Sequence, residues 1–387
     1  MMRFDSARRS RRVALSYCLA FVFIVWLSAT ASAAPQITNI SLRGLRSAAT
    51  TTLTIDGADL LPEPKILLAI PIRAQSIKPG ATASRVQMDV TLPQVPAGMY
   101  KLRVANAKGV SASVLIGIDD LAQIPYGTHI DQLPAALTGN LAYGTTLQTS
   151  FTGKKGQRLV VDLEARRLGA AFDPVVELYD ARRVQLAYAQ GHTTLQGDAR
   201  LEAVLPADGQ YLVELHDLLY QGGNPDYFRP KIGTLAFADL LYPMGGQRDS
   251  TASFEMIGSG LPQASRLQVD LHGAVSDIPA ALPHTPGLVG PAPRLIVGEF
   301  PEVLETTPPA GKLQEVTAPA VINGRIGKPH EEDRYRLVVK PGMRLRFDVL
   351  ANRAGSPLDG DLFIRNEAGA QLAASDDRPD TVDPGLD

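Results

Sequence analysis

Cysteine and tryptophan are almost absent from this sequence. The single cysteine, Cys18, and the single tryptophan, Trp26, both lie within the first 34 residues. The rest of the chain therefore forms no disulfide and offers no thiolate as a metal ligand or nucleophile. The lack of tryptophan also removes the largest aromatic faces on which a binding surface can stack sugars.

Paired catalytic residues are also missing. The six histidines are scattered, and no two of them have the i, i+4 or H-x-H spacing that places two ligands on one metal. Ser259 stands in Gly258-Ser259-Gly260, which lacks the wider G-x-S-x-G of a nucleophile elbow. We therefore predict no catalytic centre within these 387 residues and no cofactor. The alternative is an enzyme site assembled in space from scattered histidines and aspartates.

Residues 1–34 are typical of an export signal. An arginine-rich start precedes an apolar run from Val13 to Leu27, and Ala31-Ser32-Ala33 matches a cleavage site. The alternative, a membrane anchor, needs about 20 apolar residues, and this run is shorter. Twin arginines at Arg11-Arg12 leave export in a folded state open beside the general route. We expect a protein of the periplasm or cell surface, with no membrane span after removal of the signal.

Without the first 34 residues the chain carries 33 basic and 39 acidic side chains, a net charge of −6. A modestly acidic chain lacks the basic surface that nucleic-acid binding requires, so we expect no nucleic-acid partner.

A gapless repeat organises the chain. The segment from Lys154 to Ala187 lies over the segment from Lys340 to Ala373 at a shift of 186 positions. A spacing this wide indicates tandem domains, because solenoid units recur every 20 to 50 residues. The identical residues of the first copy are Lys154, Gly156, Arg158, Leu159, Asp162, Ala165, Arg167, Gly169, Asp173, Gln185, Leu186 and Ala187.

Period-two alternation predicts an all-β fold of tandem antiparallel β-sandwiches. Between Gln36 and Ile118 short alternating runs are separated by turn residues, as in a small sandwich. The phrases D-G-A-D-L and P-A-G-M-Y-K-L-R-V-A-N-A-K-G-V-S of this region resemble IPT/TIG domains, which are immunoglobulin-like modules. That resemblance covers about 80 residues and implies an immunoglobulin-like sandwich over residues 35–118.

The repeated unit has its own family resemblance. G-x-x-L-x-x-D-L, F-D-P-V-V-E-L-Y-D and the closing P-A-D-G-Q-Y-L-V-E-L resemble the bacterial pre-peptidase C-terminal domain, a jelly-roll-type β-sandwich usually appended to secreted enzymes. This implies one such module at residues 119–234 and a second at 315–387. After Leu201 the first copy has two more strand-like runs, whereas the second stops at Asp387. We therefore expect a C-terminally incomplete second module with exposed sheet edges, in a chain that is the N-terminal portion of a longer protein.

The segments between the two copies are less distinctive. Phe254 to Leu261 echoes Thr52 to Leu60, with Gly258 over Gly57, so we interpret residues 235–277 as a reduced immunoglobulin-like element. Prolines recur too often in residues 278–314 for a regular sheet, although Arg294 to Val297 have the pattern of an edge strand. We interpret 278–314 as a semi-rigid linker.

Acidic residues gather in the second copy. Carboxylates converging from two loops are what a six- to eight-coordinate Ca²⁺ requires, and some pre-peptidase domains bind calcium. The alternative is a solvated turn whose aspartates bond the local backbone. The first copy has Tyr188 to Thr194 where the second has acids, so we expect no ion there. The predicted calcium ligands are Asp359, Asp361, Asp376, Asp377 and Asp380.

Asp162 and Arg167 recur as Asp348 and Arg353. An enzyme would use such a pair as an acid and an electrophile, but recurrence in both copies favours structural ion pairing.

We predict a secreted, non-catalytic modular protein that acts as a binding and spacer scaffold at the cell surface or in the periplasm. Its ligand would be an unidentified protein or polysaccharide of the cell envelope, bound by loops and strand edges. The alternative is the N-terminal accessory region of a larger secreted hydrolase, a peptidase, whose catalytic domain follows residue 387.

Overall fold

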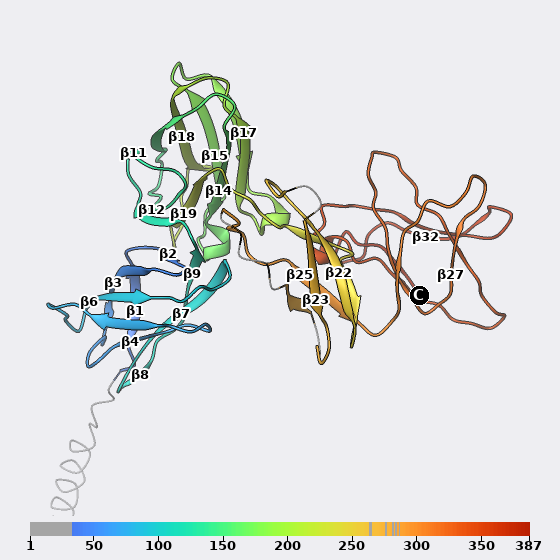
Figure 1. The fold of residues 1–387 in the computed structure, drawn as a ribbon, viewed down its shortest axis with the longest axis horizontal. Helices are drawn as coiled ribbons and strands as arrows, with labels where there is room; N and C mark the ends of the chain where they lie inside the picture. The colour runs from blue at the N-terminus through green and yellow to red at the C-terminus, as the bar shows by residue number, and fades with distance from the viewer. Residues whose placement is uncertain (1–32, 263–264, 275–276, 281, 283–284, 286) are drawn as a thin grey trace, which may run out of the picture.

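The computed structural model describes residues 33–387 except 263–264, 275–276, 281, 283–284 and 286. The predicted export signal, with Cys18 and Trp26, lies outside this range apart from its last two residues. The described chain forms four successive β modules, which confirms the all-β fold of tandem antiparallel sandwiches (Figure 1). Within that part of the chain, no helix has the length and apolar character to cross a membrane.

The N-terminal sandwich packs the sheet β1-β3-β6-β5 against the sheet β2-β9-β7-β4, with β8 beside β7. Alternation decides which side chains face the core: Leu53 and Ile55 of β3 are buried, whereas Thr52, which precedes Leu53, faces solvent. Its strands are β1 Gln36–Ile40, β2 Gly44–Arg46, β3 Thr50–Ala58, β4 Lys65–Leu67, β5 Ala74–Ile77, β6 Arg85–Thr91, β7 Gly98–Asn106, β8 Gly109–Val110 and β9 Val114–Asp119.

The first repeat copy is a sandwich of two five-stranded sheets, β10-β12-β19-β14-β17 and β11-β13-β18-β15-β16. The central strands β19 and β18 are the last two in sequence. Its elements are β10 Ala122–Pro125, β11 His129–Ile130, β12 Ala135–Asn140, β13 Leu147–Gly153, β14 Arg158–Glu164, the 3-10 turn η1 Arg166–Leu168, β15 Pro174–Asp180, β16 Gln185–Gln190, the 3-10 turn η2 Thr193–Leu195, β17 Ala199–Val204, β18 Gly209–Asp217 and β19 Tyr227–Gly233.

The third sandwich packs β20-β22-β23 against β21-β25-β24 around Phe254, Leu271 and Leu295. Its strands are β20 Leu240–Tyr242, β21 Gly245–Gln247, β22 Thr251–Ile257, β23 Arg266–Asp270, β24 Ile278–Pro279 and β25 Arg294–Gly298.

The interpretation of residues 278–314 as a linker is therefore wrong for much of that segment. The strand expected at Arg294 to Val297 is present as β25, but it lies in the middle of its sheet and not at an edge. It pairs with β21 and β24 and buries Leu295 and Val297 in the core, so β24 and β25 belong to the third sandwich. Pro279 is tolerated because β24 is an edge strand, where a missing N–H costs no ladder bond. β26 Glu302–Leu304 already belongs to the second repeat copy.

The echo between the N-terminal and third sandwiches has a structural cause. A Cβ on Gly57 would lie 1.8 Å from the carbonyl oxygen of Gln36, and one on Gly258 would lie 2.0 Å from that of Phe237. In both sandwiches, the end of the second paired strand (β3 or β22) passes so close to the preceding backbone that only glycine fits.

The second repeat copy repeats the strand pairings of the first copy but lacks counterparts of β18 and β19. It consists of four two-stranded ribbons, β26-β28, β27-β29, β30-β33 and β31-β32. Its remaining elements are β27 Gln314–Val316, β28 Val321–Asn323, β29 Tyr335–Leu337, β30 Phe347–Asp348, the 3-10 turn η3 Asn352–Ala354, β31 Leu362–Arg365, β32 Gln371–Ser375 and β33 Gly385–Leu386. In this copy Val338, Val339 and Leu372 are more than half exposed.

Candidate functional site

The outer face of one sheet in the first repeat copy is buried between its neighbours. On β14, Leu159, Val161 and Leu163 face the core of the sandwich, so Val160, Asp162 and Glu164 point the other way. That outer face is covered by the chain leaving the N-terminal sandwich and by the third sandwich (Figure 1). A small apolar cluster marks the contact: Leu121, Ala136, Val160, Leu235, Phe237 and Val289.

Lys231 of β19 lies at the centre of this face and is fully buried. Its ammonium nitrogen is 2.8 Å from a carboxylate oxygen of Asp162 and 2.7 Å from one of Glu164. It also donates a hydrogen bond of 3.1 Å to the carbonyl oxygen of Val289 in the third sandwich. All three donor positions of the ammonium are thus used, and one of them crosses a module boundary.

Arg229, two residues before Lys231 on β19, joins the same face to the N-terminal sandwich. Its guanidinium donates to Glu164 at 2.6 Å and to Asp119, the last residue of β9, at 2.5 Å. The guanidinium Nε donates to the amide oxygen of Gln123 at 3.2 Å. Arg229 is fully buried, and its fork geometry lets one cation satisfy acceptors from two modules.

A second set of ion pairs fixes the end of β14. Arg167 donates to Asp162 at 3.1 Å and to Asp198 at 2.6 Å, and Asp198 also accepts the backbone N–H groups of residues 165–167. In the second copy Arg353 donates to Asp348 and Asp383, and Asp383 accepts the N–H groups of residues 351–353. The predicted pairing of Asp162 with Arg167, and of Asp348 with Arg353, is confirmed. In both copies these residues stabilise the turn that follows the strand β14 or β30.

Two arginines extend the contact to the third sandwich. Arg200 donates to Asp162 at 2.9 Å and to Asp239 at 2.8 Å, and its guanidinium lies 3.7 Å from the centre of the Phe237 ring. Arg158 bonds Glu202 of its own module and Ser259 of the third sandwich. Ser259 therefore serves a contact between modules.

We call Asp119, Asp162, Glu164, Arg229 and Lys231 the junction network. Burial by itself would raise the pKa of Glu164, but the positive charges of Lys231 and Arg229 outweigh burial and hold that pKa at about 2. The same balance, with Arg167, Lys231 and Arg200 as cations, keeps the pKa of Asp162 well below its usual range. Both carboxylates are therefore ionised at neutral pH. Through Asp119 and the carbonyl oxygen of Val289, the contacts of the network join three modules.

The sequence contained a signal for this network that we did not use. Asp162 and Glu164 alternate on one strand and Arg229 and Lys231 on another, and the two strands pair with Asp162 opposite Lys231. A D-x-E strand beside an R-x-K strand predicts cross-strand ion pairs. The burial of these ion pairs depends on the neighbouring modules, and no local sequence pattern shows where those modules lie.

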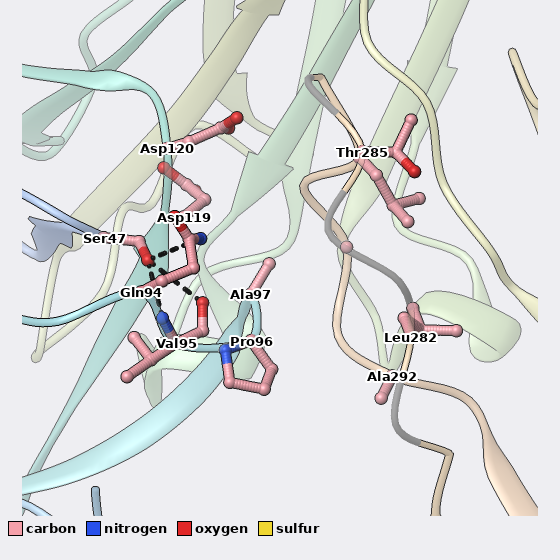
Figure 2. A pocket seen from close by; sticks show the side chains of 12 residues that line it. Ser47, Gln94, Val95, Pro96, Ala97, Asp119, Asp120, Leu282, Thr285 and Ala292 are labelled. Atoms are coloured by element: carbon pink, nitrogen blue, oxygen red, sulfur yellow. Dashed lines mark hydrogen bonds between the residues drawn. The ribbon is translucent and has the colours of Figure 1, made fainter. Parts of the chain in front are cut away.

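A cavity lies close to this junction, between the N-terminal sandwich and five residues of the third sandwich (Figure 2). The five are Leu282, Thr285, Leu288, Gly290 and Ala292. Figure 2 shows Ser47 bonded to Gln94 and Val95 on one wall, with Leu282, Thr285 and Ala292 on the other. Its volume is about 40 Å³, room for water but far below the roughly 300 Å³ of a small-molecule site.

Three of the five predicted calcium ligands converge. One carboxylate oxygen each of Asp359, Asp376 and Asp377 lies within 4.8 Å of the others, and all three residues are exposed. Desolvation and the negative charges of Asp376, Asp359 and Asp361 raise the pKa of Asp377, which places Asp361 nearby. Asp380 is not part of this group. Calcium binding here stays a prediction.

The equivalent place in the first copy is a surface hollow lined by Asp173, Gln190 and Gly191, which align with Asp359, Asp376 and Asp377. His192 at its rim is bonded to Thr194. Across residues 33–262, 265–274 and the other described positions, the acidic trio of the second copy is the one group of three or more His, Cys, Asp or Glu side chains with metal-site geometry.

Comparison with known proteins identifies no family. No family model matches the chain, and no curated protein matches it.

Solved structures that are similar to parts of this chain have low identities and TM-scores. SGBP-B of the mixed-linkage glucan utilization locus of Bacteroides ovatus is 11% identical, with a TM-score of 0.20 over 47% of this chain and 73% of that one. SGBP-B from a xyloglucan utilization locus of Bacteroides uniformis is 10% identical, with a TM-score of 0.20 over 52% and 73%. The secreted serine protease VesC from Vibrio cholerae is 11% identical, with a TM-score of 0.21 over 55% and 53%. At these identities and TM-scores, the functions of those proteins say nothing about the function of this chain.

Proposed function

We propose that this chain is a secreted, non-catalytic scaffold that holds its modules in a fixed relative orientation outside the cell. The junction network supports this most directly. Three modules contribute to one buried set of polar contacts, through Asp119 of the N-terminal sandwich, Lys231 of the first copy and the carbonyl oxygen of Val289 in the third sandwich. Moving one module away would leave a buried charge without one of its partners, which costs free energy.

The tight interior of the joint also supports a structural role. The cavity at Ser47 admits only water, and the charged side chains of the junction network are committed to one another. A catalytic acid or base needs access to substrate and a pKa near the working pH. Asp162 and Glu164 have neither, because both are buried and their pKa values lie well below the usual range.

Rigidity is tested by distances between introduced labels. The chain after the export signal has no cysteine, so Lys101→Cys and Gln268→Cys place unique spin labels on exposed positions of β7 and β23. We expect one narrow distance distribution between the two labels. The matched sample adds Lys231→Met, which should broaden it. A distribution equally broad in both samples contradicts the scaffold proposal.

The binding surface we propose is the end of the first copy that carries Tyr143, Leu219 and Tyr220. These side chains are 80%, 67% and 48% exposed, and the N–H of Gly144 donates to the carbonyl oxygen of Tyr220, which joins the two loops. Exposed aromatic and aliphatic side chains on adjoining loops are typical of binding surfaces. The partner would be a protein or polysaccharide of the cell envelope.

Binding is tested by affinity electrophoresis in gels containing purified envelope polysaccharides. The double variant Tyr143→Ala, Tyr220→Ala should lose retardation, whereas Tyr188→Ala, a half-exposed tyrosine on β16, should keep it. If both variants migrate as the unchanged protein does in every retarding gel, this end of the first copy is not the binding surface.

A further inference from the structure

The surface hollow in the first repeat copy is large enough for a ligand. Its volume is about 370 Å³, within the roughly 300–1,000 Å³ of small-molecule sites. The ends of β15, β16 and β18 and the 3-10 turn η2 surround the hollow, and its lining includes Asp173, Gln190, Thr193 and Leu218. The hollow therefore lies directly beside the loop that carries the exposed Tyr220.

The wall of the hollow offers both donors and acceptors of hydrogen bonds. Asp173 has a carboxylate, which only accepts, and Gln190 has an amide, which does both. The Nδ1 atom of His192 accepts the N–H of Thr194 at 3.3 Å, which leaves the other ring nitrogen, Nε2, as a donor. Leu218 adds apolar surface. A ligand with several hydroxyl groups matches this mixture, because each hydroxyl both donates and accepts.

The charges at the hollow favour a neutral ligand. The carboxylate of Asp173 lies 3.8 Å from the guanidinium of Arg166, so these two charges offset each other. Anionic ligands are bound most strongly by cations that have no carboxylate partner already. The aligned residues of the second copy, Asp359, Asp376 and Asp377, make the same place strongly negative there. A neutral ligand thus suits the first copy alone.

An aromatic ring stands beside the hollow. Tyr220 follows Leu218 by two residues, and its ring stacks on that of His216, with ring centroids 4.5 Å apart and planes 5° apart. His216 lies in the same cross-strand row as Gln190, with Val175 of β15 between them. Two strand spacings, about 10 Å, therefore separate His216 from Gln190. Tyr220 is 48% exposed, so the ring face turned away from His216 is open to a ligand.

One buried carboxylate positions both the wall and the ring. Asp217 accepts the N–H of Asp173 at 2.8 Å, and it accepts the N–H groups of Leu219 at 3.2 Å and Gln221 at 2.8 Å. These bonds hold Tyr220 at a φ of +58°, in the left-handed region that bulky side chains rarely adopt. Backbone strain of this kind is concentrated at binding sites, where the surrounding structure imposes it.

We propose that the hollow and the ring of Tyr220 form one site for a neutral oligosaccharide. One sugar ring stacks its apolar C–H face on Tyr220, and the hydroxyl groups of the next sugar bond to Asp173, Gln190 and His192. This inference rests on the proposed function, because Tyr220 belongs to the binding surface proposed above. It narrows the partner from an envelope protein or polysaccharide to a neutral glycan.

The site is tested by isothermal titration calorimetry of the secreted protein. The probes are neutral oligosaccharides of glucan, mannan, galactan and xylan, with oligogalacturonate as the anionic probe. We expect a neutral probe to bind and Gln190→Ala to weaken its binding about tenfold, because ligand hydrogen bonds are lost. Gln210→Ala, which removes an exposed amide at the far end of β18, is the matched control and should bind as the unchanged protein does.

Three results of this titration overturn the proposal. The first is that no neutral probe binds at millimolar concentration. The second is that oligogalacturonate binds more tightly than every neutral probe. The third is that Gln190→Ala binds as tightly as Gln210→Ala.

Two substitutions of Tyr220 separate binding from stability. Glycine adopts the left-handed φ without strain, so Tyr220→Gly should change the unfolding temperature little, since relief of strain offsets the lost contact with His216. It should nevertheless weaken binding about tenfold, because the ring is gone, whereas Tyr220→Phe should stay within about twofold of the unchanged protein. Equal affinities of the two variants would overturn the stacking role of the ring.

Failure of this inference can be told apart from failure of the proposed function. If Gln190→Ala is retarded normally in a polysaccharide gel but Tyr143→Ala, Tyr220→Ala is not, the binding surface stands and the hollow is refuted. If every neutral probe fails while a charged polysaccharide or an envelope protein binds through Tyr143 and Tyr220, the surface again stands and the ligand class is wrong.

Discussion

Replacing Lys231 by methionine should destabilise the first repeat copy strongly. Methionine keeps the apolar stem of the side chain and is one heavy atom shorter, so the change removes mainly the charge. The carboxylate oxygens of Asp162 and Glu164 that lie 2.8 and 2.7 Å from the ammonium then lose their partner in a fully buried setting. Removing one partner of a buried pair costs about 3–5 kcal/mol. Asp162 keeps Arg167 and Arg200, so we expect a loss of about 3 kcal/mol, near the lower end of that range.

The assay is native-state hydrogen exchange of peptides from β14 and β19, which reports the opening free energy of this sheet in a chain of several modules. Lys155→Met is the control, because it makes the same change on an exposed position of the same module. We expect the control to stay within about 0.5 kcal/mol of the unchanged protein. A loss below about 1 kcal/mol for Lys231→Met, in the range of an exposed pair, would refute the junction network as an energetic joint.

Three other outcomes are expected. The low pKa of Glu164 means that its contribution to the free energy of unfolding is complete above about pH 4.5 and falls by roughly 3 kcal/mol as the pH falls toward 2. The difference in free energy of unfolding between the unchanged protein and Glu164→Gln, measured by urea unfolding, should shrink over that window. A constant difference would contradict this prediction. Gly57→Ala should destabilise the N-terminal sandwich by about 1–3 kcal/mol, because the new Cβ would meet the carbonyl oxygen of Gln36; an unchanged melting temperature would count against the close approach. Calcium should raise the unfolding temperature of the second copy, and the double variant Asp376→Asn, Asp377→Asn should abolish the rise; no rise in the unchanged protein would leave the acidic loop a solvated turn.

Much of the fold could be predicted from local sequence patterns. Alternation of threonine with leucine and isoleucine in Thr50–Ala58 was sufficient to predict β3, because successive side chains of a strand point to opposite faces of the sheet. The repeat likewise predicted that Asp348 and Arg353 have the same structural role as Asp162 and Arg167.

The rest depends on contacts between distant segments. Glu164 and Lys231 have the polar character of a solvated sheet face, and they are buried because the N-terminal and third sandwiches cover that face. Prolines obscured β24, and the edge position expected for β25, for a related reason. An edge strand tolerates Pro279, but whether a segment lies at an edge is a property of the assembled sheet.

The junction network also constrains the order in which this protein can mature. Its contacts join residue 119 to residue 229 and residue 231 to residue 289. A chain that emerges N-terminus first can complete the N-terminal sandwich early, yet Lys231 lacks its last acceptor until residue 289 has followed. The contacts of the junction network are therefore complete only after all three modules have folded, the third sandwich last.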